Sequence, residues 1–80
     1  MCLAVPGKII ELREDNDLLT SAKVKFGPLN KEINLGLLPE AKIGDYVLVH
    51  AGIAISIINE SEAQKIYHDL ESLHINLELE

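Results

Sequence analysis

The sequence contains one cysteine and three aromatic residues among its 80 residues. A single thiol cannot form an internal disulfide, and small secreted domains usually depend on disulfides, so a reducing compartment is expected. Three aromatic rings also offer little surface on which nucleic-acid bases could stack. These shortages argue against a disulfide scaffold and against a binder of single-stranded nucleic acid.

Long apolar runs are missing as well. The longest one, residues 47–58, is interrupted by a histidine, a glycine and a serine. It is shorter than the ~20 residues that a membrane span needs. The apolar residues before Pro6 are too few for the core of an export signal. We therefore expect a soluble cytoplasmic protein.

The acidic charge is distributed unevenly along the chain. The net charge is −6, and residues 60–80 contain six acidic groups and one lysine, whereas residues 1–59 are nearly neutral. Acidic surfaces repel phosphate backbones, so this balance argues against nucleic acid as a partner.

The first three quarters of the chain have the pattern of short strands. Five segments are expected to be strands: residues 8–13, 22–26, 31–37, 46–50 and 53–58. A turn signal at Pro6-Gly7 precedes the first, and Gly27-Pro28 predicts a hairpin between the second and third. The last two runs are apolar on both faces, which predicts central strands. A connection with at most one helical turn is expected between residues 39 and 45.

The pattern changes to helical spacing at Asn59. Asn59 and Glu62 fit a capping box, and an amphipathic helix is expected over residues 59–74, followed by a tail at 75–80. Eighty residues form one domain, 1–80. The expected fold is mainly β: residues 1–58 form a small closed barrel of about five strands, because closure removes exposed strand edges.

Cys2 is the first candidate for chemistry. Free cysteine is commonly a small buried hydrophobe, but the first residues of a chain are a poor place for a core side chain. If Met1 is removed, the α-ammonium of Cys2 would favour its thiolate, which is the form that binds metals. The residues alone leave the functional and the structural role equally open.

His50 is the second candidate, on one face with Tyr46 and Leu48. A core histidine that hydrogen-bonds the backbone is the commoner role of such a residue. Gly52, however, indicates a β-bulge or a close backbone approach, and bulges often re-aim side chains at sites. His68 and His74 are six residues apart, do not stack on one helix face, and are interpreted as solvated.

Sequence motifs of catalysis are missing. We find no nucleophile elbow, phosphate loop, dinucleotide fingerprint or zinc-ligand pair. A dyad of Cys2 and His50 is conceivable, but we expect so short a chain to leave little room for a substrate pocket of ~300 Å³ or more. The prediction is therefore a protein that is not an enzyme.

Three stretches carry a family resemblance: residues 1–8 (MCLAVPGK), 24–27 (VKFG) and 44–55 (GDYVLVHAGIAI). Together they resemble the HypC/HupF family, small chaperones of [NiFe]-hydrogenase maturation. The similarity runs from Met1 to about Leu70, and one departure is Pro28, where the family often has a second glycine.

The resemblance implies a fold and a function. The fold would be an OB-like β-barrel with a C-terminal helix. Such proteins bind an iron–sulfur partner, HypD, transiently carry iron as Fe(CN)2(CO), and deliver it to the precursor of the hydrogenase large subunit. By resemblance, Cys2 would bind both the iron and the partner, and His50 would assist. The remaining partner-binding residues would be Leu3, Ala4, Val5, Pro6 and Gly7.

Two other functions compete with this interpretation. One is a structural adaptor that bridges two maturation proteins and whose Cys2 contacts protein and never metal. The other is an OB-type nucleic-acid binder, which the charge and the shortage of aromatic residues argue against.

Overall fold

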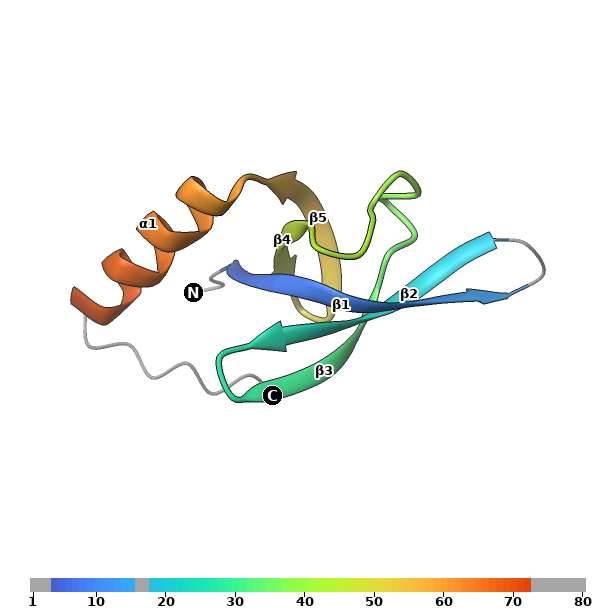
Figure 1. Cartoon of the computed structure of the whole chain (residues 1–80), viewed down its shortest axis with the longest axis horizontal. Helices are drawn as coiled ribbons and strands as arrows, with labels where there is room; N and C mark the ends of the chain where they lie inside the picture. Colours follow the sequence, from blue (N-terminus) through green and yellow to red (C-terminus); the bar gives the residue numbers. More distant parts are fainter. Residues whose placement is uncertain (1–3, 16–17, 73–80) are drawn as a thin grey trace.

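The computed structural model describes residues 4–15 and 18–72 and consists of five strands followed by one helix (Figure 1). The helix α1 lies beside the end of the barrel at which β1 begins (Figure 1). The elements are β1 (Val5–Asp15), β2 (Leu18–Phe26), β3 (Leu29–Asn34), β4 (Tyr46–His50), β5 (Ile53–Ile58) and α1 (Glu60–Ser72). The prediction of a mainly β fold is confirmed.

The strands close into a barrel in the order β1-β2-β3-β5-β4. Neighbours are antiparallel except at the seam between β3 and β5, which pair in parallel at Asn34 and Ile53. The amide of Asn34 donates to the carbonyl of Gly52 at 2.9 Å across this seam. Closure pairs every strand with two neighbours, as the sequence predicted.

Alternate residues of the strands fill the barrel. In β2, Ala22, Val24 and Phe26 point inward, and in β4 Val47 and Val49 do so. Burying a side chain of this size stabilises the fold by about 1.5–3 kcal/mol relative to exposure. The remaining core comes from the other strands and the loop after β3: Val5, Ile9, Ile33, Leu35, Leu38, Ala41 and Ala54.

The first strand begins earlier than predicted, at Val5 rather than Lys8. Pro6-Gly7 is part of β1 and not a turn, so that expectation is wrong. β1 pairs with β4 from Val5 onward, but it pairs with β2 only from Lys8. Proline therefore fits at position 6, because the N–H group that it lacks is not needed for a hydrogen bond to β2. A Cβ on Gly7 would lie 2.4 Å from Cγ1 of Val24, so only glycine allows this close approach.

The hairpin predicted at Gly27-Pro28 is confirmed. Phe26 pairs with Leu29 across a two-residue turn in which Gly27 has a φ of 59°. The following strand is shorter than expected and ends at Asn34 rather than residue 37. It ends because the side chain of Asn34 accepts a hydrogen bond from the amide of Gly36 at 2.7 Å, which turns the chain.

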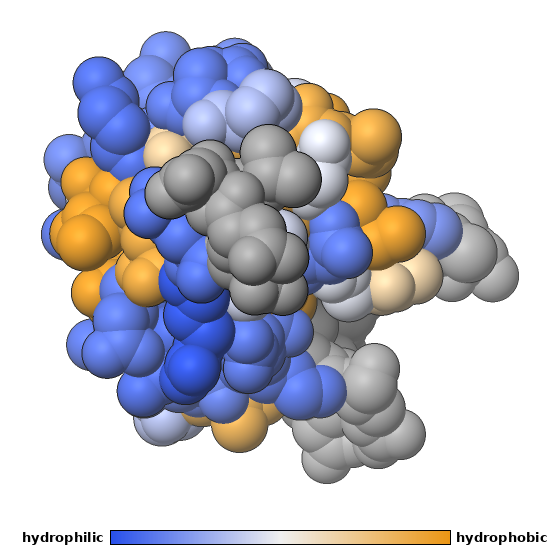
Figure 2. Space-filling model, turned by 90° about the vertical axis from the view of Figure 1, so that its right-hand side faces the viewer, coloured by the Kyte–Doolittle hydropathy of each residue, from blue (hydrophilic) through white to orange (hydrophobic). Residues whose placement is uncertain are grey.

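The fifth strand differs from the central strand that its apolar sequence predicted. Ala54 is buried, but Ile53, Ile55 and Ile57 are 40%, 45% and 37% exposed. The face that contains these three isoleucines is therefore the partly exposed one, and apolar residues on both faces do not mean burial on both faces here. Figure 2 shows the face at the β1–β2 end of the molecule, where the visible apolar surface forms patches separated by hydrophilic residues.

The helix starts as its capping box predicted. Asn59 Oδ1 accepts from the amide of Glu62 at 2.7 Å, and Glu62 Oε1 accepts from the amide of Asn59 at 3.2 Å. Ala63 is fully buried, and Ile66 and Tyr67 are half-buried, so this stripe faces the barrel. The helix thereby packs on β1 and β4, beside the start of the first strand.

Candidate functional site

The candidate site lies where the N-terminal segment enters the barrel. Cys2 and Leu3, which the sequence singled out, lie outside the described residues. The description begins at Ala4, which is half-buried, and Val5, Pro6 and Gly7 that follow are buried in β1. The three buried residues anchor the segment. Among the described residues that the sequence assigned to partner binding, Ala4 is the one with exposed surface.

A hydrogen bond from the helix fixes this anchor. The hydroxyl of Tyr67 in α1 donates to the carbonyl oxygen of Pro6 at 2.6 Å. That carbonyl lies in the part of β1 that β2 does not pair, so the tyrosine takes the place of a missing strand partner. The sequence predicted an amphipathic helix here, but helical spacing could not show that the Tyr67 hydroxyl reaches β1.

The environment keeps the Tyr67 hydroxyl protonated. Burial raises the pKa of Tyr67 above its usual value of about 10, and the neighbouring Tyr46 raises that pKa further. A neutral phenol can donate a hydrogen bond, whereas a phenolate cannot. The bond to Pro6 is therefore maintained throughout the physiological pH range.

The imidazole of His50 belongs to the same end of the barrel. His50 is the last residue of β4, and the antiparallel register places Val5 opposite Val49. The next residues outward are Ala4, which precedes β1, and His50 at the end of β4. The topology thus brings Ala4 and His50 together, although almost the entire barrel sequence separates them.

The alternative of a core histidine does not fit the structure. His50 is half-buried, alternates with the buried Val47 and Val49, and therefore lies on the outer face of the barrel. Among the described residues, no hydrogen bond of its imidazole is found. Its role as a ligand stays a prediction.

The glycine after His50 has a different role from the one expected. Ala51 and Gly52 form the β4–β5 turn with φ of 54° and 81°, and nothing approaches a Cβ placed on Gly52. The bulge or close approach predicted at Gly52 is therefore wrong. A register shift does occur nearby, between Leu48 and Val49 of β4.

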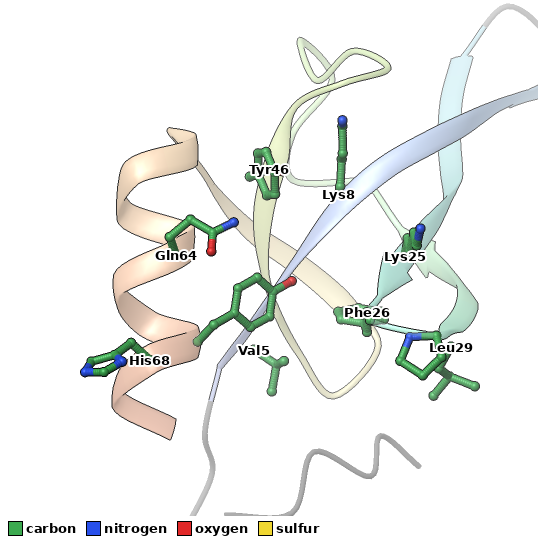
Figure 3. Close-up of a pocket in the computed structure, with 11 residues that line it drawn as sticks. Val5, Lys8, Lys25, Phe26, Leu29, Tyr46, Gln64 and His68 are labelled. Carbon is green, nitrogen blue, oxygen red and sulfur yellow. The ribbon is translucent and has the colours of Figure 1, made fainter. Parts of the chain in front are cut away.

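A groove of about 710 Å³ adjoins the anchored segment (Figure 3). The groove is larger than the ~300 Å³ for which so short a chain was expected to leave little room, because α1 forms one wall beside the barrel. The opposite wall is the β2–β3 hairpin. The groove is lined by Val5, Lys8, Lys25, Phe26, Gly27, Pro28, Leu29, Tyr46, Gln64, Tyr67 and His68.

The groove combines apolar and cationic side chains. Val5 and Phe26 lie beneath it, and Lys8 and Lys25 rise from neighbouring strands (Figure 3). The Lys8 ammonium lies 5.8 Å from the centroid of the Tyr46 ring, within the range of a cation–π contact. Sequence reasoning missed these lysines, because only the strand register brings positions 8 and 25 together.

The described residues do not form a complete metal cage. Within residues 4–15 and 18–72, no three His, Cys, Asp or Glu side chains gather closely enough to hold a metal ion. His68 is exposed, as predicted, and its ring lies at the outer side of α1 (Figure 3), whereas His74 lies outside the described residues. In the described part of the chain, no helix is long and apolar enough to cross a membrane.

Comparison with known proteins identifies the family. The pattern of the HupF/HypC family matches residues 1–70. The chain belongs to the HupF/HypC family. The matched residues include the whole barrel, its N-terminal segment and most of α1, so the family assignment covers the candidate site and the fold that positions it.

Individual relatives agree with the family assignment. The chain is 47% identical to hydrogenase maturation factor HypC of Synechocystis over 94% of this chain and all of that protein. It is 43% identical to the HypC of Azotobacter chroococcum over 81% of this chain and 73% of that one. It is 33% identical to hydrogenase maturation factor HybG of Escherichia coli K12 over 96% of each. The resemblance read from the three sequence stretches is confirmed.

Proposed function

We propose that this protein is a hydrogenase maturation chaperone whose N-terminal segment carries an Fe(CN)2(CO) group. With a HypD-like iron–sulfur partner it would assemble this group, and it would deliver the group to the precursor of a [NiFe]-hydrogenase large subunit. The observation that supports the proposal is the anchored segment: β1 begins at Val5, at the end of the barrel that holds His50, and Cys2 precedes Val5 by three positions in the sequence.

The chemistry of the two side chains suits such a cargo. Thiolate and imidazole are both ligands of iron, and cyanide and carbon monoxide occupy further coordination positions. Two protein ligands form an open site, whereas a cage of four would retain its metal. A carrier has to release its cargo, so an incomplete ligand set that the partner completes fits this function.

We assign different roles to the two parts of the N-terminal segment. Cys2 and Leu3, with the exposed side of Ala4, are the residues that we assign to the partner and the iron. Val5, Pro6 and Gly7 are buried, so their contribution to partner binding is to hold the segment in place. The protein would act as a carrier in the cytoplasm and not as an enzyme.

Infrared spectroscopy tests the proposal directly. The protein is purified together with its HypD-like partner from cells that mature hydrogenase, and spectra are recorded in the cyanide and carbonyl stretching region. Bands in that region that disappear in the Cys2→Ala complex are expected. An intact wild-type complex without such bands would show that the protein is an adaptor and carries no iron group.

A further inference from the structure

The rim of the barrel beside His50 has an exposed apolar surface. His50 and Ile53 are direct register partners across the β4–β5 turn, so their side chains lie on the same outer face. Ile53 is 40% exposed, and Ile55, further along β5, is 45% exposed. We call these two isoleucines the isoleucine patch. Ala4 adjoins His50 on the other side, as the β1–β4 register requires, so the patch is continuous with the candidate site.

The isoleucine patch lies in a part of the chain without charged side chains. Residues 46–59 contain no aspartate, glutamate, lysine or arginine, although 25% of the residues in the chain are of these types. Exposed strands are commonly protected from association by charged side chains, lysine above all. β5 lacks that protection, so a surface that complements the patch would itself be apolar and uncharged.

The neighbouring elements leave the isoleucine patch open. In the part of the chain that the structure describes, α1 packs mainly on β1 and β4, and β3 pairs with β5 only at Asn34 and Ile53 (Figure 1). Single exposed apolar residues are normal on protein surfaces, whereas contiguous apolar surface often marks an interaction site. The patch is of the second kind, because it continues into the residues assigned to the iron and the partner.

An apolar surface beside His50 suits a ligand that two proteins share. The apolar surroundings of a metal site control the access of solvent to it. Interface residues that surround the central contacts likewise exclude water from them. On the isolated chain, the side of His50 that faces β5 is bordered by exposed isoleucine, and a partner seated on that isoleucine would exclude water there.

We propose that the isoleucine patch docks against an uncharged apolar surface of the HypD-like partner. The contact would close the side of His50 that faces β5, and Ile53 and Ile55 would be contact residues and not ligands. The identity of the partner rests on the proposed function. The inference adds the surface of this chain on which that partner sits.

Affinity for the partner tests the contact. Binding of the full-length protein to the purified HypD-like partner is measured by calorimetry in the absence of the iron group. The variant Ile53→Thr/Ile55→Thr makes the patch polar and keeps the β-branching that suits a strand. Its dissociation constant is expected to be higher by about tenfold or more, because two apolar contacts are lost.

The matched control is Ile10→Thr/Ile43→Thr. These isoleucines are 37% and 62% exposed, so Ile43 is more exposed than either residue of the isoleucine patch. They lie near the start of β4, where the amide of Gly44 donates to the carbonyl of Ile9, whereas His50 ends that strand. The same chemical change there should leave the dissociation constant unchanged.

A second measurement covers the case in which the patch variant does not fold. A photoreactive phenylalanine analogue is placed at position 55 in one protein and at position 43 in another. Irradiation of each complex should cross-link the partner through position 55 and not through position 43.

Three results would overturn the proposal. The first is an unchanged dissociation constant in a folded patch variant, and the second is cross-linking through position 43 but not position 55. The third is a dimer of the isolated protein, seen by sedimentation, that the patch variant dissociates, because the occupant would then be a second copy.

Failure of this inference and failure of the proposed function give different results. Cyanide and carbonyl bands in a complex whose affinity the patch variant leaves unchanged would remove the docking surface and keep the carrier. A patch variant that weakens a complex without such bands would keep the docking surface and remove the iron group.

Discussion

Tyr67 connects the helix, the first strand and the candidate site through a single hydroxyl. Its hydrogen bond to the carbonyl of Pro6 spans 61 positions of the chain and ends beside the segment that carries Cys2. A hydrogen bond of this kind contributes about 0.5–1.5 kcal/mol net. The residue thus supports the site without belonging to its ligands.

Replacing Tyr67 by Phe removes the donor and keeps the ring. We expect the free energy of unfolding to fall by about 0.5–1.5 kcal/mol and the amides of the first strand residues to exchange faster. Urea unfolding and hydrogen exchange measure the two effects. Tyr46→Phe is the matched control, because no hydrogen bond of the Tyr46 hydroxyl is found among the described residues. An equal fall in the free energy of unfolding of both variants would show that the hydrogen bond from Tyr67 to Pro6 does not stabilise the fold.

The same hydroxyl predicts a pH dependence of stability. The folded state raises the pKa of Tyr67, so its contribution is fully present below the unfolded value of about 10 and is lost as the pH rises through the higher folded value. Stability should therefore decline above about pH 10, and the decline should be smaller in Tyr67→Phe. Urea midpoints measured from pH 8 to 11 for both proteins test this, and parallel pH profiles would contradict it.

Cys2 and His50 differ in the weight that the proposed function places on them. Cys2→Ala should abolish maturation of the hydrogenase large subunit and leave the thermal midpoint of the barrel unchanged, because Val5 and the strand that it begins are not altered. His50→Ala should reduce maturation less, since the proposal gives the histidine only an assisting role. The yield of processed large subunit in cells measures both. Normal maturation with Cys2→Ala would disprove the central assignment.

Among the elements, β1 contributes most to positioning the candidate site. It pairs with β2 and β4, contributes Val5 and Ile9 to the core, and begins with the anchored residues. Its path depends on Gly7, where the backbone approaches Val24 and Phe26 more closely than any side chain allows. The strand therefore combines the closure of the barrel with the support of the N-terminal segment.

Gly7→Ala tests this dependence. The added methyl group would meet Cγ1 of Val24 at 2.4 Å and Cε1 of Phe26 at 2.7 Å, so overpacking should cost about 1–3 kcal/mol. Gly36→Ala is the control, because the nearest atom to its methyl group is the side-chain oxygen of Asn34 at 3.0 Å. Denaturant unfolding compares the two variants. A Gly7→Ala protein as stable as the native one would show that the strand can shift away from β2.

The elements also show which parts of the structure the sequence could predict. The hairpin at Gly27-Pro28 and the capping box at Asn59 and Glu62 depend on local chemistry, and both were predicted correctly. Pro6-Gly7 was misread as a turn, because whether a proline interrupts a strand depends on which neighbour pairs with it. The exposed isoleucines of β5 were misread for the same reason: burial depends on the other strands.

At the scale of the whole molecule, the barrel is closed unevenly. Most neighbours share ladders of several residues, whereas β3 and β5 meet at Asn34 and Ile53. The candidate site could be predicted only in part, because it depends on how the elements meet. Cys2 and His50 were singled out from the sequence, but the proximity of Ala4 to His50 follows from the β1–β4 register and the pairing of Lys8 with Lys25 from the β1–β2 register.

This uneven closure predicts where the barrel opens first. The amide of Asn34, which donates across the seam, should exchange with solvent faster than the amides of Ala22 and Val24 in β2, which is paired along both edges. Native-state hydrogen exchange measures this difference. Equal protection of these three amides would mean that the barrel opens as one cooperative unit.

The register between β1 and β4 also makes folding a condition for the proposed function. Ala4 and His50 are far apart in the sequence. They become neighbours only after Val5 has paired with Val49, which is also the step that joins β1 to β4. Under the proposal, an unfolded chain would offer Cys2 and His50 separately, so cargo would be loaded only onto chaperones that have folded.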